Sequence, residues 1–362
     1  MTQKRTKMTV PNRCSTRLTL LCGMLTLGVA FLPAEQAGTP RPDAVPAEDS
    51  GTPVIRAKVH LVLVDVIARN SKTGLPANTL GRESFRIFED QHEVAITAFD
   101  SGAAYATRPI ALWFVVICNE PSKSQYGYHA ELASGRFAGK EMLLRPALDD
   151  LDKRDRVGVA HWCDNGEAQL DLLPTEAKDV AISKLAEVLK PDSARVYSTD
   201  PNRTGELTLQ KLMRFIVEDA HQRNPQPLPA IVFLHTDQTG MPHDELDRVA
   251  STLLETSGIV FGIKDANVAE PFTGRFRDGE QAGVLHYLSG TTGGQYFSVK
   301  PELYAKALQS ILLQLHFRYE LAFKPPAVDR KMHKLRVELV GETKKEHDSV
   351  QLSYRYAYIA KP

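Results

Sequence analysis

The chain has 362 residues, of which 43% are hydrophobic and 24% are charged. These fractions are close to the averages of globular proteins and exclude a wholly disordered or fibrous chain, while the length allows roughly two domains. Lysine and arginine number 44, and aspartate and glutamate also number 44, so the formal net charge is zero. A balanced chain lacks the basic excess that a general nucleic-acid-binding protein needs.

The first 37 residues predict a secretory signal peptide. Residues 1–17 hold five basic residues and no acidic one, and an uncharged apolar stretch runs from Leu18 to Leu32. This arrangement is typical of export signals. The stretch is shorter than the roughly 20 residues that a membrane-spanning helix needs, and an uncleaved N-terminal anchor is the alternative. Residues 38–53 are rich in proline and glycine and predict a flexible linker.

Short alternating apolar stretches predict strands on both sides of the chain's central part. Within residues 54–107 they lie at 54–68, 85–89 and 94–99. Within residues 318–362 they lie at 319–323, 334–340 and 350–358. We therefore expect a β-rich N-terminal segment without a helix and a C-terminal β segment, which could pair with each other.

The central residues 108–317 predict an α/β domain. Four continuously apolar stretches are typical of strands buried on both faces of a parallel sheet, at 110–118, 157–162, 230–235 and 259–263. Two further strands are expected, a hairpin partner at 168–173 and a last strand at 295–299. Helix-compatible segments occupy 136–152, 175–190, 205–221, 243–257, 280–289 and the residues after Pro301. This alternation predicts a mostly parallel sheet with helices on both faces.

Two local features of these helices are specific enough to compare with a structure. Val180, Leu185 and Val188 share one face of the helix at 175–190, so we expect them to be buried. Gly258 follows the helix at 243–257, and we expect it to be the C′ residue that ends this helix.

The carboxyl ends of the buried strands are where an open parallel sheet binds its ligands. The chain has no G-x-G-x-x-G or G-x-x-x-x-G-K-[ST] loop that would cradle phosphates, and no G-x-S-x-G elbow. Instead, C-N-E-P-S-K-S begins at Cys118, C-D-N at Cys163 and T-D-Q-T-G at Thr236. These loops favour neither nucleotide binding nor α/β-hydrolase chemistry.

Several stretches, in this order, carry a resemblance to a known family. They are LVLVDVIARNSKTGLPANTLGRESFRIFED from Leu61, AIVFLHTDQTG from Ala230, TTGGQYF from Thr291, HFRYELAFKPP from His316 and HKLRVEL from His333. The set resembles a von Willebrand factor type A (vWA) domain, in the variant found in acidobacterial secreted proteins. The resemblance covers most of residues 55–340. It implies a three-layer, Rossmann-like sheet and a role in protein binding or adhesion without enzymatic activity.

The resemblance also implies a Mg²⁺ ion at a metal-ion-dependent adhesion site. In the family, a D-x-S-x-S loop after the first buried strand supplies oxygen ligands, which a hard cation prefers. Here Cys118 or Asn119 holds the position of the lead aspartate. The nearest match is E-x-S-x-S, formed by Glu120, Ser122 and Ser124.

Two further positions match the family's site. Thr204 corresponds to its threonine and Asp237 to its second aspartate. Glutamate is longer than aspartate, Pro121 restricts the loop, and Mg²⁺ demands near-ideal octahedral geometry. We therefore expect a degenerate site that has lost its metal, with a retained Mg²⁺ ion as the alternative.

A second group of residues at the strand ends has a different chemistry. Cysteine, histidine and aspartate side chains suit Zn²⁺, and the group consists of Cys118, His161, Cys163, His235 and Asp237. The spacing matches no known zinc signature, and the two histidines lie within or at the end of apolar strands, where core histidines are common. If the sheet order follows the family, Cys118 and Cys163 lie on neighbouring strands and could form a disulfide in an oxidising compartment.

The sequence thus predicts an exported binding protein that contacts another protein through the carboxyl edge of its sheet. A zinc-dependent hydrolase and a structural envelope component with a defunct site are the alternatives. Loss of residues 1–37 would leave 39 basic and 43 acidic residues and only two of the four cysteines. This mildly acidic chain, with no membrane span after cleavage, would act in the periplasm, in the cell envelope or outside the cell.

Overall fold

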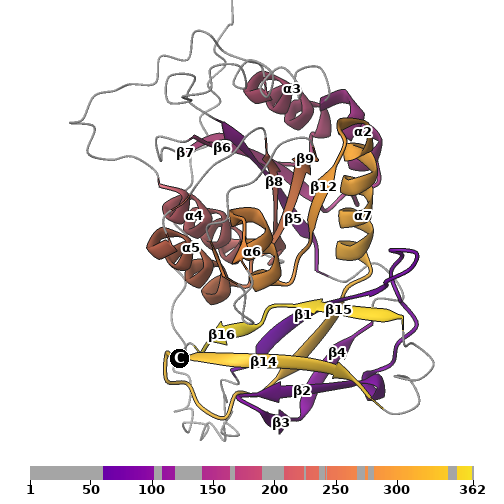
Figure 1. Cartoon of the computed structure of the whole chain (residues 1–362), viewed down its shortest axis with the longest axis vertical. Helices are drawn as coiled ribbons and strands as arrows, with labels where there is room; N and C mark the ends of the chain where they lie inside the picture. The colour runs from indigo at the N-terminus through magenta and orange to yellow at the C-terminus, as the bar shows by residue number, and fades with distance from the viewer. Residues whose placement is uncertain are drawn as a thin grey trace, which may run out of the picture. The chain divides into compact units, whose positions relative to one another are not determined.

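The continuously apolar stretches form the centre of a six-stranded sheet (Figure 1). Its order is β12 (Tyr296–Val299), β9 (Ile259–Asp265), β8 (Leu228–His235), β5 (Ile110–Cys118), β6 (Arg156–Cys163) and β7 (Ala168–Thr175). All neighbouring strands pair in parallel except β6 and β7, which are antiparallel. Counted along the chain, this is the 3-2-1-4-5-6 order of a doubly wound sheet. The predicted α/β class and the hairpin at 168–173 are confirmed.

The structure is a computed structural model. It describes residues 60–101, 108–118, 141–163, 168–189, 208–223, 226–235, 241, 243–266, 274–275, 281–340 and 349–360. All of them belong to one compact unit, Ala57–Pro362.

Helices cover both faces of the six-stranded sheet. One face packs against α2 (Glu141–Asp149), α3 (Lys178–Leu189) and α7 (Tyr304–His316), the last preceded by the 3₁₀ turn η2 (Pro301–Leu303). The other face packs against α4 (Leu209–Gln222), α5 (His243–Thr256) and α6 (Val284–Thr292). Alternate residues of β5 enter the two cores, since Phe114 packs on the first side and Trp113 on the second. The central strand is therefore apolar at every position described, as the sequence indicates.

The flanking segments pair with each other in two four-stranded sheets. The first has the order β15 (Val350–Tyr354), β1 (Val62–Asn70), β13 (Tyr319–Phe323) and β4 (Ile96–Asp100). The second has the order β16 (Ala357–Ile359), β14 (Met332–Leu339), β2 (Phe85–Glu89) and β3 (His92–Val94). We call these two sheets the β unit; both contain strands from each end of the chain. The expected pairing of the two ends is confirmed. A two-stranded hairpin, β10 (Gly274–Arg275) and β11 (Gln281–Ala282), completes the strands described.

Strand β1 joins the β unit to the α/β part. Val64 and Val66 point into the core of the β unit, whereas Ile67 packs in the helical core beside the six-stranded sheet. Because side chains alternate along a strand, Asp65 points to the same side as Ile67. A carboxylate is thereby buried between the two parts of the structure.

Two stretches predicted as single strands are each divided between the two sheets of the β unit. Residues 94–99 contain the end of β3 and most of β4, and residues 350–358 contain β15 and the start of β16. The division is set by pairing with strands far away in the sequence. The N-terminal β segment, predicted without a helix, also contains the 3₁₀ turn η1 (Arg82–Ser84).

Two predictions about helices were wrong. Val180 is 49% exposed, because the buried stripe of α3 runs through Ile182, Leu185 and Val188. The left-handed residue after α5 is Ser257, with φ of 60°, and not Gly258. The Gly258 N–H instead donates to the Leu253 carbonyl over 3.3 Å. This is the hydrogen bond between residues five positions apart that defines a Schellman cap. A Cβ at Gly258 would lie 3.2 Å from the Leu253 side chain, so close packing accounts for this glycine.

Candidate functional site

The carboxyl ends of β5, β6 and β8 lie side by side at one edge of the sheet. In the register of the parallel pairs, Cys118 is opposite Cys163, and Ile117 is opposite His235. This is the edge at which doubly wound sheets bind ligands. We call it the carboxyl edge; it is defined by these last residues of the three strands.

The predicted metal-ion-dependent adhesion site would follow directly from this edge. Glu120, Ser122, Ser124, Thr204 and Asp237 themselves lie outside the described residues. The backbone shows where two of them depart: Glu120 is two residues beyond the end of β5, and Asp237 is two residues beyond the end of β8. Since β5 and β8 are hydrogen-bonded neighbours, the strands that precede the two acidic residues in the sequence end side by side.

The start of α4 can be compared with the position of Thr204. Helix α4 begins at Leu209, and Thr208 is its N-cap, whose hydroxyl accepts from the Lys211 N–H over 3.3 Å. The cap satisfies one of the otherwise unpaired N–H groups of the first turn. Thr204 lies four residues before this cap and outside the described residues.

Of the predicted zinc ligands, only His161 has a described side chain. It is buried, and its Nδ1 lies 2.8 Å from Asp171 Oδ2 on the antiparallel partner β7. It is therefore a paired core histidine of the kind the sequence pattern favours. The side chains of Cys118, Cys163 and His235, and all of Asp237, lie outside the description. Within the described part of the chain, no three histidine, cysteine or acidic residues form a group that could hold a metal ion.

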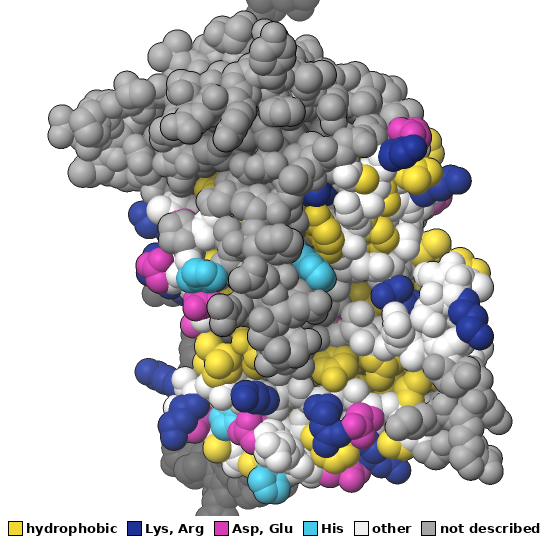
Figure 2. Space-filling view, viewed as in Figure 1, with side chains coloured by type: hydrophobic (Ala, Val, Ile, Leu, Met, Phe, Trp, Pro, Cys, Tyr) yellow, Lys and Arg dark blue, Asp and Glu magenta, His cyan; other side chains and the backbone are white. Residues whose placement is uncertain are grey.

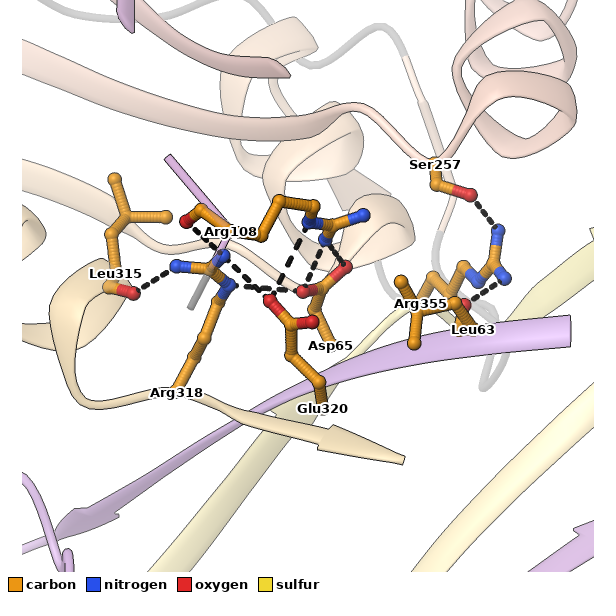
Figure 3. Close-up of polar contacts among 8 residues, drawn as sticks. All are labelled: Leu63, Asp65, Arg108, Ser257, Leu315, Arg318, Glu320 and Arg355. Atoms are coloured by element: carbon orange, nitrogen blue, oxygen red, sulfur yellow. Dashed lines mark hydrogen bonds and ion pairs between the residues drawn. The ribbon is translucent and has the colours of Figure 1, made fainter. Parts of the chain in front are cut away.

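A buried ionic cluster lies at the opposite end of the six-stranded sheet (Figure 3). Asp65 of β1 accepts hydrogen bonds from Arg108 Nη2 at 2.6 and 2.8 Å and from Arg318 Nε at 3.0 Å. Arg318 Nη2 also donates to Glu320 over 2.7 Å, and Arg108 Nε lies 3.4 Å from the same carboxylate. Arg318 is only 1% exposed. We call these four residues the junction cluster, since they connect β1 and β13 with the start of β5 and the end of α7.

The protonation equilibria of the two carboxyl groups in this cluster are shifted in opposite directions. Burial raises the pKa of Asp65, but the charges of Arg108 and Arg318 outweigh it and hold that pKa below its usual value. For Glu320, burial and the nearby Asp65 raise the pKa above its usual value, despite both arginines. The cluster therefore holds Asp65 as the firmly ionised partner.

The junction cluster was not predicted from the sequence, although the sequence contains a signal for it. Asp65 interrupts an otherwise apolar strand, and Arg318 and Glu320 flank Tyr319 at the start of another. A charged residue inside an apolar strand is rarely buried without a partner. That signal indicates that partners exist, but their identity depends on residues 43 and 253 positions away.

The described surface of the β unit seen in Figure 2 carries charges of both signs. On the face in Figure 2, basic and acidic side chains are interspersed over its described residues. The β unit also has exposed pairs of opposite charge, such as Arg86 with Glu93 and Arg336 with Glu338. Nothing among the described residues in this view resembles the basic stripe of a nucleic-acid-binding surface. No described helix is both long enough and apolar enough to cross a membrane.

Comparisons with known proteins identify similar structures only. No protein-family model matches the chain, and no curated protein matches it. The vWA protein from Catenulispora acidiphila is 10% identical, with a TM-score of 0.35 over 76% of this chain and 73% of that one. Proximal thread matrix protein 1 from the mussel byssus is 13% identical, with a TM-score of 0.34 over 60% of this chain and 48% of that one. The SpRpn10 VWA domain is 10% identical, with a TM-score of 0.31 over 56% of this chain and 94% of that one.

These similarities are too remote to transfer a function. The chain spans about half the length of the mussel protein, one structure of which has a zinc-occupied adhesion-site motif. The fold class follows from the structure itself, through its strand order and its helices on both faces. The protein has a doubly wound α/β fold with two added β sheets.

Proposed function

We propose that this protein is an exported, non-enzymatic binding protein of the vWA type found in acidobacterial secreted proteins. Its carboxyl edge would contact another protein. The observation that carries the proposal is the convergence of β5, β6 and β8, whose last residues lie in register at one edge. The loops that follow these strands contain Glu120 and Asp237, which supply negative charge for a partner's basic residues or for a bridging cation.

Contacts at the opposite end of the sheet support the proposal, because they anchor that end to the β unit. Arg108, two residues before β5, is bound to Asp65 of β1. The Ile110 N–H at the start of β5 donates to Asp155 over 2.8 Å, and the other oxygen of Asp155 lies 3.0 Å from His316 Nε2. These buried contacts hold the amino end of β5 rigidly, and a site at the carboxyl edge benefits from such a support.

We propose further that the adhesion site is degenerate and does not depend on tightly bound Mg²⁺. The support is the sequence of the loop, in which the lead aspartate is absent and Glu120 takes over two positions later. A glutamate on a proline-restricted loop is a poor match to the octahedral geometry of Mg²⁺. Partner binding should then persist in the presence of a chelator.

The test is recovery of bound proteins by the immobilised full chain from an envelope extract of the source organism. The Glu120→Ala/Asp237→Ala double variant should lose the partner that the wild type recovers. The matched control, Glu93→Ala/Glu338→Ala, removes two exposed acidic residues of the β unit and should retain it. Equal recovery by the wild type and the first double variant would rule out the carboxyl edge. Loss of recovery with a chelator would instead indicate a functional metal site.

A zinc-dependent hydrolase is the second candidate. The register favours it in one respect, because it sets Cys118 opposite Cys163 while His235 ends the other neighbour of β5. Metal analysis of the purified protein distinguishes the two. Stoichiometric zinc that is lost in a His235→Ala variant would favour the hydrolase, whereas protein without zinc that still binds its partner would favour the proposal. A structural envelope component would bind its partner through another surface.

A further inference from the structure

A cavity of about 400 Å³ lies beside the junction cluster, at the end of the sheet opposite the carboxyl edge. Its walls come from the start of β1, the last turns of α4 and α5, and the residues around β16. The ionisable side chains among its lining residues are His60, Arg108, His221, Glu255 and Arg355, together with a tyrosine. The volume lies within the range of pockets that hold small molecules.

Arg355 is the feature of this cavity that needs an explanation. It is 8% exposed, its Nη1 donates to Ser257 Oγ over 2.6 Å, and its Nη2 donates to the Leu63 carbonyl. Its Nε is buried and has no hydrogen-bond partner among the described residues. Figure 3 shows Arg355 apart from the junction cluster, with neutral oxygens as its acceptors. In the described part of the chain, no carboxylate forms an ion pair with it.

A buried guanidinium without an ion-pair partner is costly, and the charge of Asp65 offsets the desolvation of Arg355 only in part. Burial lowers the pKa of Arg355 to about 10, so the group stays charged at neutral pH. Together, the cavity wall and the junction cluster contain the buried Arg318 and Arg355 and the partly buried Arg108, against the two carboxylates of Asp65 and Glu320. Glu255 does not restore the balance, because its carboxylate lies 3.8 Å from Arg214.

We propose that this cavity binds a small oxyanion, the carboxylate or phosphate group of a soluble molecule, with Arg355 as its main donor and Arg108 as a second cation. Arg355 uses one N–H of each Nη on Ser257 and on the Leu63 carbonyl, which leaves a second N–H on each, and a guanidinium presents its donors in a fork that matches such anions. An anion would balance the excess positive charge in the cavity wall. The site is separate from the carboxyl edge and independent of the function proposed there.

The test is isothermal titration of the full chain with inorganic phosphate and, separately, with acetate. The wild type should bind at least one of these anions saturably. Preference for phosphate would indicate a phosphorylated ligand, and preference for acetate would indicate a carboxylate. Arg355→Gln should weaken the binding by about 10- to 100-fold, the equivalent of one hydrogen bond to a charged group. The control Arg248→Gln, which removes an exposed arginine from the outer face of α5, should bind as the wild type does.

Two results would overturn the proposal. One is that the wild type binds neither anion saturably, and the other is that Arg355→Gln binds as tightly as the wild type. If Arg355→Gln does not fold, Arg355→Lys decides, because it keeps the charge but loses the forked donors of the guanidinium. It should bind about tenfold more weakly, and unchanged affinity would refute the site. Thermal unfolding with and without the anion excludes a purely structural role, since only a ligand-binding arginine changes the stabilisation that the anion adds.

Discussion

Replacement of Asp65 by asparagine tests whether the junction cluster holds the β unit and the α/β part together. Asparagine keeps the shape of the side chain but removes the charge that faces Arg108 and Arg318. Asp65 accepts three hydrogen bonds of 2.6–3.0 Å from these two arginines, and Glu320 alone would remain against them. Removing one partner of a buried ion pair costs about 3–5 kcal/mol, so Asp65→Asn should lower the free energy of unfolding by that amount.

The assay is urea unfolding followed by tryptophan fluorescence. The chain has two tryptophans, Trp113 in β5 and Trp162 in β6, and both are buried in the six-stranded sheet. Their signal therefore reports the α/β part, although the substitution is in the β unit. The matched control is Asp149→Asn, which removes an exposed ion pair with Arg145 and should cost less than about 1 kcal/mol. A loss for Asp65→Asn no larger than that of the control would refute the coupling.

The same residue predicts a pH dependence. Because the pKa of Asp65 is lowered in the folded state, its contribution to stability is complete above its unfolded pKa of about 3.8. The contribution is lost as the pH falls through the lower, folded value. The difference in unfolding free energy between the wild type and Asp65→Asn should therefore be constant near neutral pH and shrink in strong acid.

Two further predictions concern single residues, and a third concerns a pair of cysteines. Hydrogen bonds to two aspartates raise the pKa of His333 above 6.5. The stabilising effect of the protonated histidine should therefore be present below pH 6.5 and lost as the pH rises through the folded pKa. NMR titration measures the pKa, and urea unfolding measures the change in stability. Gly293→Ala should cost about 2–4 kcal/mol in unfolding free energy, since its φ is 87° and a Cβ would lie 2.5 Å from the Tyr354 backbone. Cys118 and Cys163 should be found as one disulfide-linked peptide pair by mass spectrometry after non-reducing digestion.

Each of these predictions has its own control. For His333, the Gln variant should lose the pH dependence, and an unperturbed titration would contradict the account. For Gly293, the matched substitution is Gly74→Ala, which has a φ of 73° but open space at its Cβ. It should cost only about 1–2 kcal/mol, and equal losses would show that the clash is unimportant. For the cysteines, Cα partners on adjacent strands lie about 4.8 Å apart, within the range of a disulfide, and two free thiols in exported protein would refute the bond.

The apolar pattern of the sequence predicts the architecture of the α/β part closely. The stretch from Ile110 to Cys118 is apolar throughout, and β5 has those same bounds, because a strand covered on both faces leaves no position for a polar side chain. The strand that ends at His235 and the hairpin partner that begins at Ala168 follow from similar reasoning.

What the sequence could not predict depends on distant partners. Residues 350–358 have one continuous alternating pattern, yet Val350–Tyr354 pairs with β1 and Ala357–Ile359 with β14. Arg355, between the two strands, turns into the cavity. Its exposure and its contact with Ser257, 98 residues away, are set by tertiary packing and not by local pattern.

At the carboxyl edge, the sequence could predict which strands end side by side, but not which side chains act there. The expected proximity of the strands that end in Cys118 and Cys163 is confirmed by the register. The metal ligands depend on side chains in the loops beyond the strands, such as Glu120 and Asp237, and these residues lie outside the described part of the chain. Whether they bind a metal stays a prediction.

The most direct test of the central proposal is site-specific photo-crosslinking. A photoreactive amino acid in place of Ser122, in the loop after β5, should form a covalent adduct with the partner in an envelope extract. The same amino acid in place of Arg330, on the exposed turn before β14, should form none. The account predicts an adduct from position 122 that disappears in the Asp237→Ala background. An adduct from position 330 alone would contradict it and place the binding surface on the β unit.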